Sequence, residues 1–135
     1  LKSIDATVEV HQLACPLFVP FVEEGWIDDP LTNIMVFRYL QPLVSTGIDT
    51  LILGCTHYPI LHASIQKVMG AHVTLVESGK ALGEQMLLSW PDLSKKDASP
   101  RTIDILLTDY SARSEKLARQ FLDPIIPTSV TAHLL

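Results

Sequence analysis

Apolar residues recur along the chain in two patterns, short continuous runs and longer stretches at helical spacing. From Leu31 to Val44 they return every three or four residues, which is typical of one face of a helix. The stretch from Thr50 to Gly54 is short and apolar and ends in a glycine, which favours a buried strand. Together the two patterns predict helices at 20–24, 31–44, 59–69, 78–90 and 112–122, and strands at 7–10, 50–54, 72–76 and 102–108.

Strands and helices alternate in this prediction, and the alternation indicates an α/β fold with a largely parallel sheet. Asp29 and Pro30 suit the cap and the first turn of one helix, and Gly47 suits the stop that follows it. The polar, proline-containing stretch 90–101 predicts a linker or long loop. The apolar tail 123–135 predicts a packed strand or an extended segment.

Composition narrows the class of protein. The chain has 135 residues, of which 47% are hydrophobic, so it can bury the core of one ordinary domain. The net charge is −5, and the basic residues are scattered, so we expect neither a nucleic-acid partner nor an anionic membrane surface. The longest apolar run, 13–22, is too short to span a bilayer. The two cysteines form no CxxC pair or disulfide framework, which fits a reducing cytoplasm.

The residues Cys55, Thr56 and His57 follow the strand predicted at 50–54. Ligands of parallel α/β sheets bind beyond the carboxyl ends of the strands, which is where these residues are expected. A helix opening at Pro59 would favour a thiolate at Cys55, while His57 and Thr56 could bind an anion beside it. The residues alone also allow a plainer interpretation, in which Cys55 is a small packed side chain. The remaining histidines lack ligand spacing, so no metal site is expected.

Two segments resemble motifs of glutamate racemases, in the same order along the chain. These are GCTHYPIL at 54–61 and ACPLFVPFVEEG at 14–25. The resemblance extends over most of the chain and corresponds to the C-terminal half of such an enzyme. It implies the doubly wound, largely parallel α/β fold of the aspartate/glutamate racemases, with two pseudo-symmetric lobes. Residues 1–77 would be a partial second lobe, and residues 78–135 a returning segment that completes the first lobe.

The resemblance implies cofactor-independent conversion of L-glutamate to D-glutamate for peptidoglycan synthesis in the bacterial cytoplasm. It implies no metal, and it leaves a homodimer as one option. Carried over by position, Cys55 is one of two acid/base cysteines, His57 assists it and binds substrate, and Thr56 binds substrate. Glu23 matches an active-site glutamate of the family, although the adjacent Glu24 leaves the register open.

The match has one clear departure, because the family's first cysteine turn and its N-terminal Asp-Ser-Gly motif are absent from the sequence. Cys15 does not occupy the position of that first cysteine, and we expect it to be a packed thiol. We therefore expect the chain to be a fragment that is inactive by itself. Two other functions stay open. One is a Cys/His hydrolase that uses Cys55 as a nucleophile, and the other is an inactive lobe that binds an amino acid.

Overall fold

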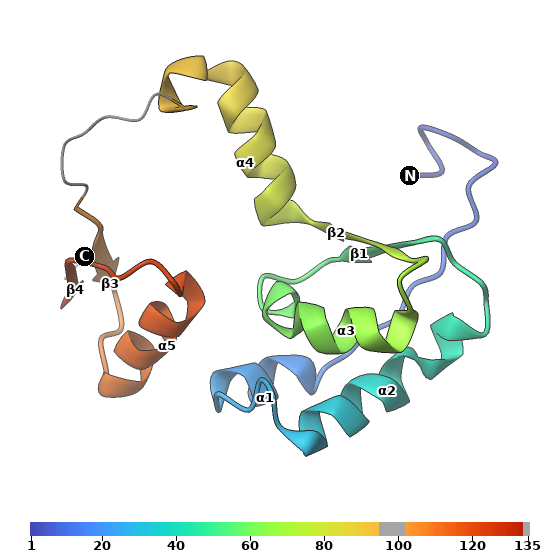
Figure 1. The fold of residues 1–135 in the computed structure, drawn as a ribbon, viewed down its shortest axis with the longest axis horizontal. Coiled ribbons are helices and arrows are strands. Elements are labelled where there is room, and N and C mark those ends of the chain that lie inside the picture. Colours follow the sequence, from blue (N-terminus) through green and yellow to red (C-terminus); the bar gives the residue numbers. More distant parts are fainter. Residues whose placement is uncertain (95–101, 134–135) are drawn as a thin grey trace. The chain divides into compact units, whose positions relative to one another are not determined.

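The computed structural model describes residues 1–94 and 102–133, and the chain divides into two compact units, Leu1–Leu82 and Gly83–Leu135. Each unit contains one pair of parallel strands (Figure 1). The expected α/β architecture with parallel strand pairing is confirmed, although the described strands form two separate pairs. No helix among the described residues is long and apolar enough to cross a membrane.

The first unit follows the predicted order of helices and strands. It contains α1 (Phe18–Glu23), α2 (Pro30–Val44), β1 (Thr50–Leu53), a 3-10 turn (Tyr58–Leu61), α3 (His62–Met69) and β2 (Thr74–Glu77), and α4 (Ser78–Ser89) begins in it. The side chain of Asp29 accepts a hydrogen bond from the backbone N–H of Leu31 at 2.7 Å, which caps α2 as expected. Gly47 and Gly70 have φ angles of 71° and 84°, so both adopt the backbone that suits glycine after a helix.

The core of this unit lies between the helices α2 and α3 and the strand pair. α2 packs against α3, and side chains from α1, β1 and the 3-10 turn complete the cluster. The ring of Phe18 meets the rings of Tyr39 and Tyr58 edge-on, at centroid distances of 5.6 and 5.2 Å. The helical periodicity overestimates the buried face of α2, because Ile34 and Phe37 are exposed.

β1 and β2 pair in parallel, with a register that runs from Thr50 beside Thr74 to Leu53 beside Glu77. Side chains alternate between the two faces of the pair. Leu53 is buried in the core, whereas Ile52 faces the other way and is 53% exposed. The helices α1, α2 and α3 lie on one side of the strands in Figure 1. The carboxyl ends of β1 and β2 therefore lie side by side, and each is followed by a helical segment.

The strand predicted at 7–10 is wrong. Residues 8–13 form neither helix nor strand, and Val8 and Val10 are exposed. Alternating apolar residues make a stable strand only when a neighbouring strand supplies hydrogen bonds and a surface to pack against. Among the described residues no strand pairs with this segment.

The second unit contains the rest of α4, a 3-10 turn (Pro91–Ser94), β3 (Asp104–Leu107), α5 (Ala112–Leu122) and β4 (Ser129–Ala132). β3 and β4 are parallel, with Ile105 beside Val130 in the register. The apolar tail thus supplies a strand, which confirms one of the two forms predicted for it. Of the linker predicted at 90–101, residues 95–101 lie outside the described residues.

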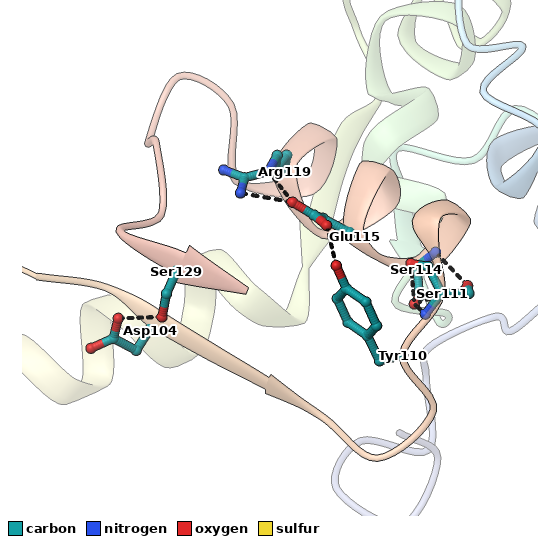
Figure 2. A network of polar contacts seen from close by, with 7 residues as sticks. All are labelled: Asp104, Tyr110, Ser111, Ser114, Glu115, Arg119 and Ser129. Carbon is teal, nitrogen blue, oxygen red and sulfur yellow. Dashed lines mark hydrogen bonds and ion pairs between the residues drawn. The ribbon is translucent and has the colours of Figure 1, made fainter. Parts of the chain in front are cut away.

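A polar network fixes the start of α5 (Figure 2). Ser111 accepts a hydrogen bond from the Ser114 backbone N–H at 3.0 Å, and Ser114 Oγ accepts one from the Ser111 N–H at 2.8 Å. The Tyr110 hydroxyl donates to Glu115 at 2.5 Å, and Arg119 donates to the same carboxylate at 2.8 Å. The bonds from Tyr110 and then Arg119 lower the pKa of Glu115. These local contacts explain why the predicted bounds of this helix are correct.

Candidate active site

The turn that follows β1 carries Cys55, Thr56 and His57. The Tyr58 backbone N–H donates to the Cys55 carbonyl at 3.2 Å, and the Ile60 N–H donates to the His57 carbonyl at 3.1 Å. This spacing is that of a 3-10 turn, and α3 begins only at His62. The prediction of a continuous helix from Pro59 is therefore corrected. The helix whose N-terminus was expected beside Cys55 begins several residues later, after the 3-10 turn.

Tyr58 anchors this turn to the core. Its hydroxyl donates to the Cys15 carbonyl at 3.3 Å, and its ring packs on Phe18. Burial raises the pKa of the Tyr58 hydroxyl, with the neighbouring Cys15 thiol as a smaller cause. The segment before α1 and the turn after β1 are thereby held together, although they are distant in the sequence.

The two cysteines have different surroundings. Cys15 is only 4% exposed and belongs to the core, and burial raises the pKa of its thiol to about 11. Cys55 is a free thiol that is partly accessible to solvent. Because the thiolate is the form that takes up a proton or attacks a carbon, Cys55 is the cysteine of this pair that is suited to chemistry.

Glu23, at the end of α1, approaches the imidazole of His57. Its Oε1 lies 3.4 Å from His57 Nε2, and the two side chains are 43% and 24% exposed. The other ring nitrogen, Nδ1, lies 3.4 Å from Thr56 Oγ1. Both ring nitrogens thus have polar neighbours, which restrict the orientation of the ring. Of the two adjacent glutamates, Glu23 makes this ion pair with His57.

The structure brings Glu23 and Thr56 to the imidazole of His57, and Cys55 precedes them in the same turn. It also adds two residues that were not singled out for this site. Glu77, the last residue of β2, contacts His62 Nδ1 through its carboxylate. No local motif marks this pair, but parallel pairing of the strands at 50–54 and 72–76 would have placed Glu77 beside the turn.

A hollow of about 1030 Å³ lies between the N-terminal segment and β1. Its lining includes Gly54 and Tyr58, which flank the turn, but Cys55 is not among its lining residues. Many of the lining groups belong to β1 and to residues 7–13. The hollow therefore follows the side of β1, and the polar side chains of the turn give a better location for the reacting groups. The described residues contain no group of three or more His, Cys, Asp or Glu that could hold a metal ion.

Comparisons with known proteins identify relatives of this chain. No protein-family model matches the chain. A curated glutamate racemase from Sulfurihydrogenibium sp. (strain YO3AOP1) is 46% identical over 125 residues, which cover 93% of this chain and 46% of that protein. The structure of a glutamate racemase isoform from Bacillus anthracis superposes with a TM-score of 0.79 at 31% identity, over 100% of this chain and 50% of that one. A Francisella tularensis glutamate racemase in complex with D-glutamate gives a TM-score of 0.75 at 26% identity, over 98% and 49%. The chain thus spans about half the length of the relatives it matches.

Proposed function

We propose that this chain, which matches the C-terminal half of glutamate racemases, supplies one side of the active site of such an enzyme. In this proposal Cys55 is one of two cysteines that exchange the α-proton of glutamate. The observation that carries the proposal is the turn after β1, where a partly exposed thiol is followed by an imidazole that Glu23 holds at 3.4 Å. The relatives are glutamate racemases, and their activity supplies the substrate class.

The reaction consists of two proton transfers. A thiolate removes the proton from the α-carbon, and the electron pair of the broken C–H bond is delocalised into the substrate carboxylate. A thiol on the opposite face then donates its proton to the same carbon, which inverts the configuration and exchanges the roles of the two sulfurs. These steps need well-placed groups with matched pKa values rather than a cofactor.

The second cysteine of this proposal comes from the half of the relatives that this chain does not match. Cys15 is unsuited to that role, because its thiol is buried and its pKa is raised to about 11. The chain is accordingly proposed to be part of a longer protein. Within it, residues 1–77 form part of the second lobe, and residues 78–135 return to the first.

His57 and Thr56 are assigned to the substrate side of the turn. With Glu23 beside Nε2 and Thr56 beside Nδ1, the His57 ring has a restricted orientation two residues after Cys55. We assign His57 to assist Cys55 and to contact glutamate, Thr56 to bind glutamate, and Glu23 to orient His57. The biological setting that we propose is a bacterial cytoplasm, where D-glutamate is used for peptidoglycan, with a homodimer as the assembly to test.

The test is α-proton exchange with the intact protein that carries this sequence. L-Glutamate is incubated in D2O, and the α-proton signal and the optical rotation are followed together. We expect both to decay, and Cys55→Ala to slow racemisation by roughly 10²- to 10⁴-fold, the range of acid/base catalysis. Cys15→Ala is the matched control and keeps most of the activity. Exchange that does not depend on Cys55 would contradict the proposal.

A second function is favoured by one observation. A cysteine hydrolase needs a group that orients its histidine, and Glu23 occupies that position relative to His57. Such an enzyme would form a covalent acyl adduct on Cys55, which intact-protein mass spectrometry detects after incubation with an activated ester. A racemase forms no such adduct with glutamate during turnover.

A further inference from the structure

Both ends of the turn that carries Cys55 are attached to the same residue, Glu77. On one side Leu53 is the partner of Glu77 in the β1–β2 ladder. On the other side His62, the first residue of α3, contacts the Glu77 carboxylate through Nδ1. Residues 54–61 lie between these two attachments. We propose that Glu77 and His62 form a clamp that positions the Cys55 turn. The effect of this clamp on catalysis rests on the function proposed above.

The turn needs such support because its own bonds are weak. The Tyr58 and Ile60 backbone bonds are of the 3-10 type, whose geometry is poorer than that of an α-helix. Tyr58 fixes the middle of the turn to the core through Phe18 and the Cys15 carbonyl. The contact between Glu77 and His62 holds the remaining end, where the 3-10 turn passes into α3.

The pair of Glu77 and His62 controls the position of the Cys55 turn and contributes little to overall stability. The side chain of His62 is 50% exposed and that of Glu77 is 21% exposed, and ion pairs with this much solvent contribute little to global stability. Proton transfer between carbon and sulfur, in contrast, is sensitive to displacements of about 1 Å. The Glu77 carboxylate is itself engaged by His62, so we assign it a positioning role and not a catalytic one.

The first readout is amide hydrogen exchange in the intact protein, which does not require activity. Glu77→Ala and His62→Ala are each expected to speed exchange at the Tyr58 and Ile60 amides by about fivefold or more, because both amides bond within the turn. The double variant is expected to add little to either single change, since the two residues act through one contact. Glu77→Asp keeps the carboxylate and restores part of the protection. The matched control is His11→Ala, which removes another histidine–glutamate pair, with Glu9 at 3.1 Å, from the N-terminal segment.

The second readout is turnover of glutamate. Glu77→Ala and His62→Ala are expected to lower kcat about tenfold while KM changes less than about twofold, and Glu77→Asp recovers part of kcat. Unchanged exchange at both amides would overturn the clamp. Faster exchange with unchanged kcat would overturn its role in positioning, and multiplied effects in the double variant would show two independent residues. If the unmodified protein does not racemise glutamate, the proposed function fails, and the exchange rates still decide the clamp.

Discussion

Glu23 Oε1 lies 3.4 Å from His57 Nε2, and this pair joins the end of α1 to the turn that carries Cys55. We predict that Glu23 and its neighbour Glu24 differ in their effect on catalysis. Glu23→Gln removes the charge beside the imidazole, and we expect it to lower kcat by about 10- to 100-fold with both enantiomers of glutamate. Glu24→Gln is the matched control and should change kcat less than about threefold. Steady-state kinetics measure both, and a larger effect at Glu24 would reverse the assignment.

The two cysteines should differ in their reaction with iodoacetamide. At pH 8 a thiol with a pKa of about 11 is ionised in only about one molecule in a thousand, and Cys15 is also buried. We expect carboxamidomethylation of Cys55 within minutes to hours and little modification of Cys15 in the folded protein. Peptide mapping by mass spectrometry measures both sites. In denaturant the two cysteines should react alike, and equal rates in the native protein would contradict the burial of Cys15.

Phe18 connects α1 to α2 and to the turn through its ring contacts with Tyr39 and Tyr58. It is 1% exposed, so Phe18→Ala should lower the free energy of unfolding by about 3–5 kcal/mol. Phe37→Ala removes a ring that is 51% exposed and should change it by less than about 1 kcal/mol. Urea unfolding followed by circular dichroism compares the two variants. A similar cost at both positions would argue against the core described above.

Gly70 ends α3 with a φ of 84°, and a Cβ atom there would lie 2.9 Å from His72 Nδ1. Gly70→Ala combines an unfavourable backbone conformation with this close approach, and should cost about 1–3 kcal/mol of unfolding free energy. At Gly83, inside α4, an added Cβ meets nothing within 4 Å. Gly83→Ala should therefore stabilise the protein by up to about 1 kcal/mol. Thermal unfolding of both variants would show shifts of opposite sign if the two backbones are as described.

The network around Glu115 predicts a dependence on pH. The Tyr110 hydroxyl and then Arg119 lower the pKa of Glu115, and the same bond raises the pKa of Tyr110 (Figure 2). A depressed carboxyl pKa contributes stability above the ordinary value of 4.5, and that contribution is lost as the pH falls through the lowered value. Tyr110→Phe should raise the pKa of Glu115 towards 4.5. Carboxyl NMR titration measures it, and an unchanged titration midpoint would show that the bond is absent in solution.

The sequence predicted most of the helices because their signals are local. Asp29 and Pro30 open α2, and the residues from Ser111 to Ser114 open α5, so short-range hydrogen bonds decide where these helices begin. The strand at 7–10 failed for the opposite reason. Its alternation is also local, but a strand depends on a partner elsewhere in the chain, and none of the described strands pairs with it.

The candidate site was predictable as a set of residue types and not as a set of contacts. The position of Cys55 after a buried strand, together with the resemblance of the surrounding motifs, singled out Cys55, Thr56, His57 and Glu23. The motif alone leaves Glu23 and Glu24 as alternatives, and the contact of Glu23 with His57 supports the first of them. The pair of Glu77 and His62 depends on the register of two strands, which no short motif encodes.

The strand register that places Leu53 beside Glu77 limits which insertions and deletions the sequence tolerates. Side chains of a strand alternate between faces, so one residue inserted or deleted at the start of β2 would move the side chains that follow it to the opposite face. Leu75 would turn away from the core, and Glu77 would leave its place beside His62. Among homologous sequences, changes in the length of β2 should therefore be rare. The exposed residues Ala71 and His72 of the preceding connection should vary more freely.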